Sequence, residues 1–341
     1  MALATATAMA ALLANGCSSA AEKQPRRATT SPTSAATSPT QTTSATPTTD
    51  GPPTGPAAHR VVVRTLPWRL PQPLAREAAI KGPRGVVVAG GLVAGDQSTS
   101  SAYTLDLSTG ASDRLPDLSV PVHDVGGVFT HGRYMVLGGG NANEQAVVQS
   151  LASRHSWVQR GQLPQPRSDL GAVTSDGQAV VVGGYDATSP ALADVLVEMP
   201  QRHWLVLGRL PVPVRYPAVT VIDRTVWVFG GERNGAMVDA IQRIDVDTGR
   251  VRVIGHLPRP LGHAAVASFG DRVLIVGGRS SASTLTAAMW WFDPASARLR
   301  RAGRLPTPLA DTVIVPRGLT AYLVGGETPQ LSDRVRRITV S

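Results

Sequence analysis

The chain has 341 residues, of which 42% are apolar and 17% are charged, so it can build a sizeable core and is not disordered throughout. It contains 34 Gly and 27 Pro, and this density of helix-breaking residues argues against a helical bundle. The one cysteine, Cys17, excludes an intramolecular disulfide, a cysteine-based zinc site and an iron–sulfur cluster.

The basic excess is dispersed along the chain. Lys and Arg number 33 against 24 Asp and Glu, which gives a formal net charge of +9. No basic run of five or more occurs, and aromatic residues make up 4% of the chain. Nucleic-acid-binding proteins normally show a clustered basic stripe, often with stacking aromatics, so we expect no nucleic-acid partner. A dispersed positive charge favours attraction to an anionic cell envelope.

The N-terminus has the features of an export signal. Residues 1–16 form an uncharged Ala- and Leu-rich stretch that is too short to span a bilayer permanently and is typical of a signal peptide. Cys17 follows directly, and residues 13–17 (LANGC) resemble the lipobox of bacterial lipoproteins, in which the cysteine is lipidated after cleavage. The resemblance implies export and attachment to the outer face of the bacterial cell membrane through the lipid alone. An ordinary secretory signal with an incidental cysteine is the alternative.

Residues 20–58 are Thr, Ser, Ala and Pro with almost no large apolar side chain. Such a segment cannot bury enough surface to offset the entropy of ordering. We therefore expect three parts: a signal peptide over 1–16, a lipidated Cys17 with a disordered Ser/Thr/Pro-rich tether over 17–58, and one folded domain over 59–341.

The folded part repeats itself six times. An apolar run ends in a glycine pair that begins at residues 90, 138, 183, 230, 277 and 325, at intervals of 48, 45, 47, 47 and 48. A second marker, LPxP or LPDLSVP, begins at residues 70, 115, 163, 210, 257 and 305. Two independent markers with one period make coincidence implausible.

Each period accommodates four short strands. In the fourth repeat we expect strands over 214–222, 225–231, 238–246 and 250–255, separated by Asp- and Gly-containing turns. Four antiparallel strands in about 47 residues are typical of a β-propeller blade. After the sixth glycine pair only residues 334–340 remain as a third strand, so residues 60–66 are expected to supply the fourth. The predicted fold is all-β: a six-bladed propeller closed by its N-terminal strand.

The glycine pairs that follow apolar strands resemble the kelch repeat. The resemblance covers residues 59–341, and the Trp that kelch blades carry after the glycines has counterparts in Trp157 and Trp204. It implies a propeller and, among kelch proteins, either a binding scaffold or an enzyme. The copper-radical oxidases with kelch blades need a cysteine cross-linked to a tyrosine, and this domain has no cysteine.

One position in each repeat is polar. The third residue after the last Pro of each marker lies just before the innermost strand, on the face shared by the d–a and b–c loops. We predict that these six side chains form a ring at the mouth of the channel, as a candidate binding ring: Arg76, Asp124, Asp169, Tyr216, His263 and Asp311. The alternative is a structural plug in which the polar side chains satisfy one another.

Residues after the glycine pairs are expected to extend the same face. They are Asn141, Asp186, Glu232, Arg233, Arg279 and Glu327. The sequence contains no HExxH, GxSxG or P-loop motif, so we assign no catalytic residue and expect neither a metal nor a cofactor.

These observations lead to two functional hypotheses. The first is a monomeric binding or scaffolding module whose partner is an envelope protein or a carbohydrate; we lean towards this non-enzymatic interpretation. The second is a cofactor-free carbohydrate epimerase or mutarotase, similar to the six-bladed kelch epimerase of N-acetylneuraminate.

The lipid anchor yields the first testable prediction. Replacing Cys17 with Ser should release the protein from membranes, because the thiol is the proposed acceptor of the lipid. Fractionation of cells into membrane and soluble parts measures this, and Ser18→Ala provides the matched control. Unchanged membrane association of Cys17→Ser would contradict lipidation.

Overall fold

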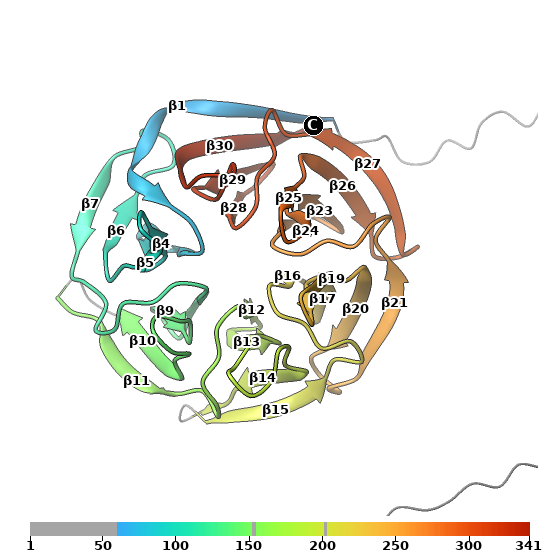
Figure 1. Cartoon of the computed structure of the whole chain (residues 1–341), viewed down its shortest axis with the longest axis horizontal. Helices are drawn as coiled ribbons and strands as arrows, with labels where there is room; N and C mark the ends of the chain where they lie inside the picture. Colours follow the sequence, from blue (N-terminus) through green and yellow to red (C-terminus); the bar gives the residue numbers. More distant parts are fainter. Residues whose placement is uncertain (1–59, 152–154, 201–202) are drawn as a thin grey trace, which may run out of the picture. The chain divides into compact units, whose positions relative to one another are not determined.

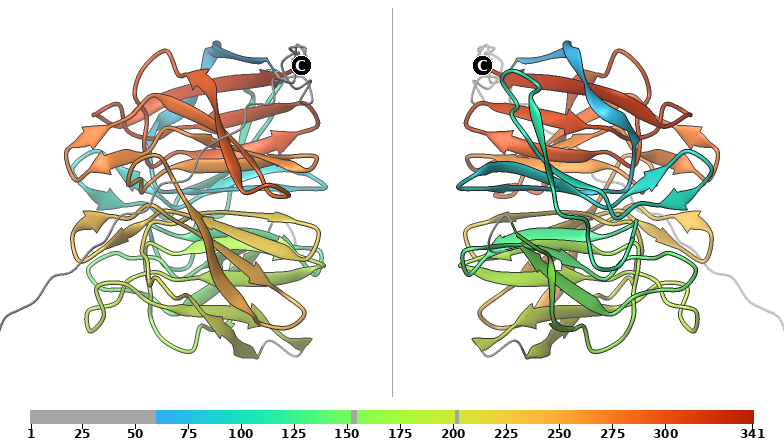
Figure 2. Two further views of the ribbon diagram at one scale, coloured as in Figure 1. Left: turned by 90° about the vertical axis from the view of Figure 1, so that its right-hand side faces the viewer. Right: turned by 90° about the vertical axis from the view of Figure 1, so that its left-hand side faces the viewer.

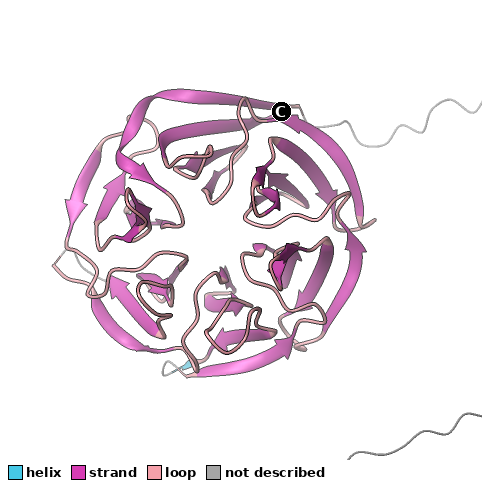
Figure 3. Cartoon of the chain, viewed as in Figure 1, coloured by secondary structure: helices cyan, strands magenta, loops and turns pink. Residues whose placement is uncertain are grey.

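A computed structural model describes residues 60–151, 155–200 and 203–341. Strands and loops make up nearly all of these residues (Figure 3). The predicted signal peptide, Cys17 and the tether lie outside the described residues. Within the described residues no helix has the length and apolar character needed to cross a membrane.

The strands form six four-stranded antiparallel sheets arranged as the blades of a propeller (Figure 1). From the axis outward, the first three blades are as follows. Blade 1 contains β2 (Ala78–Gly82), β3 (Gly85–Ala89), β6 (Ala102–Leu105) and β7 (Ser112–Leu115). Blade 2 contains β8 (Gly126–Thr130), β9 (Arg133–Leu137), β10 (Val147–Leu151) and β11 (Val158–Gln162). Blade 3 contains β12 (Gly171–Ser175), β13 (Gln178–Val182), β14 (Asp194–Glu198) and β15 (Trp204–Arg209).

The other three blades repeat this order. Blade 4 contains β16 (Ala218–Ile222), β17 (Thr225–Phe229), β20 (Ala240–Asp245) and β21 (Val251–His256). Blade 5 contains β22 (Ala265–Phe269), β23 (Arg272–Val276), β26 (Ala288–Asp293) and β27 (Arg298–Arg304). Blade 6 contains β28 (Val313–Arg317), β29 (Thr320–Val324), β30 (Ser332–Val340) and β1 (Val61–Leu74).

The four strands of a blade are called a to d, from the axis outward. Three b–c loops carry two-stranded hairpins: β4 (Leu92–Val93) with β5 (Gln97–Ser98), β18 (Glu232–Arg233) with β19 (Ala236–Met237), and β24 (Arg279–Ser281) with β25 (Thr284–Leu285). The all-β, six-bladed prediction is confirmed. The a strands start later than expected, since β16 begins at Ala218 because the chain first makes a sharp turn at the axis.

The first and last strands lie side by side. β1 pairs antiparallel with β30, with Val61 opposite Val340 and Val63 opposite Ile338. Figure 2 shows the same pairing from the side, with β1 in blue beside the red C-terminal strands. The pairing is irregular between Thr65 and Leu74, where β1 carries prolines that an outermost strand tolerates because its outer edge has no ladder to maintain. The N-terminal strand is thus strand d of the last blade.

The two sequence markers contact each other across every blade interface. The N–H of the second glycine of each pair donates to the carbonyl of the residue that follows the last Pro of the next marker, at 2.8–2.9 Å. These donor–acceptor pairs are Gly91 to Val122, Gly139 to Arg167, Gly184 to Val214, Gly231 to Leu261, Gly278 to Leu309 and Gly326 to Leu74. The shared period of the two markers therefore reflects one hydrogen bond that joins neighbouring blades.

Apolar layers between the blades hold the propeller together. Val180 and Val182 of blade 3 pack against Val226 and Ile244 of blade 4, all at 0% exposure. The leucine of every marker is also buried, at 5% exposure or less. Burial of each such side chain contributes roughly 2 kcal/mol. Successive side chains of one strand point to opposite faces of the blade, so each blade packs against both of its neighbours.

Glycine is required where a marker loop meets a glycine pair. Gly230 has φ of 57°, and a Cβ there would lie 1.9 Å from the carbonyl oxygen of Leu261. Gly270, in the turn between β22 and β23, has a similar φ of 61°, but a Cβ there would meet nothing within 4 Å. The two positions therefore separate the cost of the backbone conformation from the cost of a collision.

Alanine substitution at these two glycines tests the interface. We expect Gly270→Ala to lower the free energy of unfolding by about 1 kcal/mol, and Gly230→Ala to lower it by at least about 2 kcal/mol more, because the added methyl would separate blades 4 and 5. Urea unfolding measures both variants. Equal losses would show that the glycine pair is needed only for its backbone conformation.

Candidate functional site

All six predicted ring residues occupy equivalent places just before the a strands. Each has a left-handed backbone, with φ between 49° and 59°, which is uncommon for residues other than glycine. The residues are Arg76, Asp124, Asp169, Tyr216, His263 and Asp311. The structure thus brings together all the side chains that the repeat phase selected.

A closed circle of backbone hydrogen bonds joins these six residues. The N–H of each residue donates to the carbonyl of the equivalent residue in the preceding blade, at 2.7–3.2 Å. The circle closes where the N–H of Arg76 donates to the carbonyl of Asp311 at 3.1 Å. We call this feature the axial ring. Because its bonds are made by backbone atoms, the side chains at these positions can differ while the circle persists.

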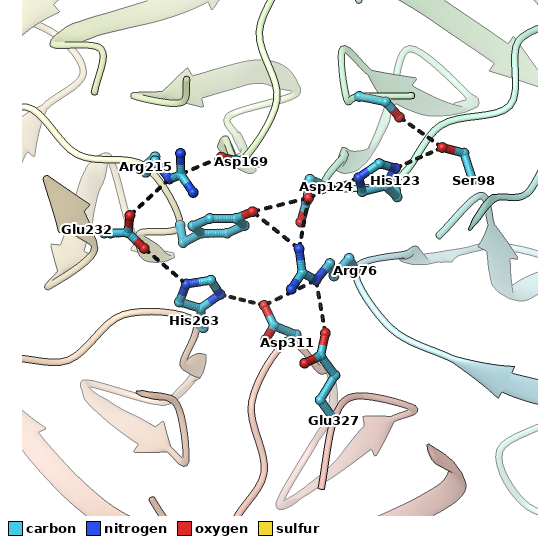
Figure 4. Close-up of polar contacts among 12 residues, drawn as sticks. Arg76, Ser98, His123, Asp124, Asp169, Arg215, Glu232, His263, Asp311 and Glu327 are labelled. Atoms are coloured by element: carbon cyan, nitrogen blue, oxygen red, sulfur yellow. Dashed lines mark hydrogen bonds and ion pairs between the residues drawn. The ribbon is translucent and has the colours of Figure 1, made fainter. Parts of the chain in front are cut away.

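Arg76 is the centre of the side-chain contacts (Figure 4). Its Nε donates to Oε1 of Glu327 at 3.0 Å and lies 3.8 Å from Oδ1 of Asp311. Its Nη1 donates to Oδ2 of Asp124 and to the hydroxyl of Tyr216, both at 3.3 Å. The guanidinium of blade 1 therefore contacts side chains from blades 2, 4 and 6.

His263 is held on both ring nitrogens. Nδ1 lies 2.6 Å from Oδ1 of Asp311, and Nε2 lies 3.6 Å from Oε2 of Glu232. The imidazole also stacks on Tyr216, with ring centroids 3.8 Å apart. Burial disfavours the charged imidazole, but Asp311 and Glu232 outweigh that cost and raise the pKa of His263. Both ring nitrogens therefore face carboxylates.

Two further arginines extend the network. Arg279 donates from Nε to Oδ2 of Asp311 at 3.1 Å and pairs through Nη2 with Glu327. Arg215 places Nε 3.3 Å from Oδ2 of Asp169 and 3.4 Å from Oε1 of Glu232. Every carboxylate of the axial ring therefore faces at least one cation.

The pKa values of the three acids in the ring shift in different directions, although burial raises each of them. Burial raises the pKa of Asp169 to about 7, helped by the nearby charge of Asp124 and opposed by Arg215. It also raises the pKa of Asp124, although Arg76 opposes this. For Asp311 burial acts in the same sense, but His263, Arg76 and Arg279 outweigh it and lower the pKa. Asp311 is thus the firmly ionised member of the three.

The post-glycine residues divide into two groups. Glu232, Arg279 and Glu327 join the network, since each lies two residues after the first glycine and its backbone bridges to the residue before a ring residue. Asn141 and Asp186 lie one residue further on and hydrogen-bond mainly within their own loops. Arg233 lies at that later position too and is exposed.

The ring prediction missed several members of the network. Arg215 and His123 directly precede ring residues, and Arg215 also stacks on Tyr185, with its guanidinium carbon 4.9 Å from the ring centroid. His123 places Nε2 3.4 Å from Asp124 and Nδ1 2.8 Å from the hydroxyl of Ser98. The sequence did indicate these two residues, because repeats 2 and 4 carry a large polar side chain one position before the ring residue.

A cavity of about 330 Å³ lies along the axis. Its lining combines the axial ring with small and apolar residues of the a strands, among them Ala79, Gly127 and Val219. Within the described part of the chain no three His, Cys, Asp or Glu side chains are grouped so as to hold a metal ion. The ring is therefore a densely cross-linked polar layer at one end of a channel whose wall consists mainly of small and apolar side chains.

The fold and this site together define a closed six-bladed β-propeller with a polar axial ring. A family model described as the KLHDC2/KLHL20/DRC7 Kelch-repeats domain matches residues 128–326, more than half of the chain. The chain belongs to the kelch-repeat family. A comparison with curated proteins finds no match to this chain.

Glu77, which follows Arg76, is an unusual buried acid. It is 2% exposed, and neither carboxyl oxygen has a well-oriented hydrogen-bond partner among the described residues. It lies between blades 1 and 6, because a Cβ added to Gly91 would lie 2.8 Å from its Cβ and one added to Gly325 3.3 Å from its Oε1. Burial raises the pKa of Glu77 to about 8, so the side chain is mostly protonated at neutral pH.

The pH dependence of stability tests this assignment. The folded protein keeps the Glu77 proton where the unfolded chain has released it, so this residue should reduce stability progressively as pH rises from about 4.5 to about 8. Glu77→Gln should remove that contribution, and its Tm should therefore fall less steeply than that of the wild type. Glu144→Gln, in a b–c loop, is the control. Parallel Tm curves for Glu77→Gln and wild type would contradict a protonated Glu77.

Proposed function

We propose that this kelch propeller is a non-enzymatic binding module of the bacterial cell envelope. It engages an envelope protein or a carbohydrate through the face built by the d–a and b–c loops, called the loop face below. It acts as a monomer that needs no cofactor, and the membrane holds it through the lipid on Cys17. Kelch propellers commonly serve as protein-binding scaffolds, which supports the general class.

The mutual pairing of the axial ring carries this proposal. Three arginines and a histidine lie among five carboxylates, and their contacts are made with one another. Such a layer satisfies buried charge and stiffens the centre of the loop face. A rigid base of this kind is suited to presenting the surrounding loops to a partner.

The loops around the ring supply the variable surface. Asp96, Arg233 and Gln330 lie in the b–c loops of blades 1, 4 and 6, and all three are exposed. Their different charges make each blade distinct at the surface even though the backbone repeats. A partner that touches several blades would therefore read a pattern specific to this chain.

The epimerase hypothesis receives less support. The close pair of His263 and Asp311, 2.6 Å apart, has the form of an acid–base pair. However, the side chain of His263 is only 6% exposed, and its second nitrogen faces Glu232. Proton transfer to a sugar would require this network to open, whereas binding at the loop face leaves it intact.

Site-specific photo-crosslinking in cells tests the loop face. A photoreactive amino acid at Asp96, Arg233 or Gln330 should yield the same crosslinked product from at least two positions, because neighbouring loops contact one partner. The matched controls, Asp176, Asp271 and Leu319, are also exposed but lie in the a–b turns at the opposite end of the blades.

The result of this experiment is decisive in either direction. Crosslinks confined to the loop face, and lost in Arg233→Glu, support the proposal. Crosslinks only from the a–b turns would place the partner on the other face, and equal labelling from all six positions would indicate random encounter.

A further inference from the structure

In each blade one c-strand residue pairs with the residue two positions before the glycine pair: Tyr103, Gln149, Leu196, Gln242, Trp290 and Arg336. In blades 2 and 4 the residue is a glutamine whose side-chain amide closes two hydrogen bonds with the backbone of the marker loop. Gln149 accepts from the N–H of Val120 at 2.9 Å and donates to its carbonyl at 3.0 Å, and Gln242 does the same with Val212 at 3.0 and 2.9 Å. Both glutamines are completely buried.

Blade 5 departs from this arrangement. Trp290 occupies the position of Gln242, since it pairs with Ile275 of β23 as Gln242 pairs with Val228 of β17. Arg259 in the LPRP marker corresponds to Val212, and its backbone N–H has no hydrogen-bond partner among the described residues. A pocket of about 340 Å³ lies between this loop and the half-buried indole. The pocket of blade 5 therefore lies where blades 2 and 4 place a completely buried glutamine.

The pocket is lined by cations without a matching carboxylate. Arg259, Arg301 and Arg304 all line it, and no Asp or Glu does. All three are exposed, and no ion pair within the described residues joins them to an acid. This differs from the axial ring, where each arginine faces carboxylates. Unpaired guanidiniums around a concave site favour an anionic occupant, which they can bind with two parallel hydrogen bonds.

The remaining lining residues describe the rest of the ligand. Trp290 provides an apolar wall with one N–H donor, while Ser280 and Thr286 provide hydroxyls from the b–c loop. A volume of about 340 Å³ lies at the lower end of the range for small-molecule sites. These features suit a compact, hydroxylated ring that carries an oxyanion.

We propose that this pocket of blade 5 binds an anionic sugar unit, either a sugar acid or a sugar phosphate. Its oxyanion pairs with Arg301 and Arg304, its ring lies against Trp290, and the N–H of Arg259 donates to it. The assignment rests on the proposed function, because residues of a d–a loop and a b–c loop line the pocket, and it specifies the chemistry of the carbohydrate that the loop face would recognise.

Calorimetric titration of the folded chain tests this site. The probes are glucuronate, glucose 6-phosphate, glucose and inorganic phosphate. We expect at least one anionic sugar to bind at least about tenfold more tightly than glucose and than inorganic phosphate. Which of the two anionic sugars binds better identifies the oxyanion as carboxylate or phosphate.

Strand β27 offers a matched pair of variants. Arg301→Gln with Arg304→Gln should weaken the affinity at least about tenfold, whereas Arg298→Gln with Arg300→Gln, which removes the same charge outside the pocket, should leave it unchanged. Trp290→Gln should close the pocket as Gln242 does and abolish binding. Tm measurements establish that each variant is folded.

Three outcomes would overturn the assignment: no binding of either anionic sugar, equal weakening by both arginine pairs, or inorganic phosphate binding as tightly as the sugars. The crosslinking experiment separates this failure from failure of the proposed function, since its probes lie in blades 1, 4 and 6. Crosslinks from the loop face without sugar binding would refute the blade 5 pocket alone.

Discussion

The circle of six backbone hydrogen bonds at the axis is the constraint on which the rest of the propeller depends. Each blade must deliver one residue in a left-handed conformation, with its N–H towards one neighbour and its carbonyl towards the other. This geometry determines where every a strand begins and at which face the marker loops arrive. Further from the axis, the hydrogen bonds from the glycine pairs to the marker loops also join neighbouring blades through backbone atoms. The interfaces between blades are therefore specified by backbone geometry first and by side-chain packing second.

Because backbone atoms close the circle, its side chains are free to serve another purpose. Here they form a cross-linked layer of arginines and acids. The guanidinium of Arg76 by itself contacts side chains from blades 2, 4 and 6. Arg–carboxylate pairs with two or more partners lose less freedom per contact than isolated pairs, and burial strengthens them. These contacts tie together the side chains at the centre of the loop face. The pocket of blade 5 contrasts with it, since Arg259, Arg301 and Arg304 line a hollow and no ion pair within the described residues joins them to an acid.

Much of this architecture could be predicted from the sequence, and the limits have physical causes. The period of the two markers predicts six blades, and counting three residues past each marker selects the axial ring, because every blade repeats the same backbone path. The pairing of side chains could not be predicted in this way. Arg215 and Tyr185 lie at positions whose residue type varies from blade to blade, and they meet because adjacent loops converge. Glu77 takes a position that Val125, Leu170, Pro217, Ala264 and Thr312 hold in the other blades, and the pocket beside Trp290 depends on how the side chains of one loop and one strand pack.

The pairing of β1 with β30 has a consequence for synthesis and folding. Among the described strands β1 is synthesised first, whereas its partner β30 is synthesised last. The edge of β1 therefore stays unpaired while blades 1 to 5 assemble. Exposed edges of this kind invite pairing with other chains. β1 is protected during that interval by Pro67, Pro71 and Pro73 and by the charges of Arg64 and Arg69. The residues that make β1 an irregular strand thus also protect its edge against pairing with other chains until the ring closes.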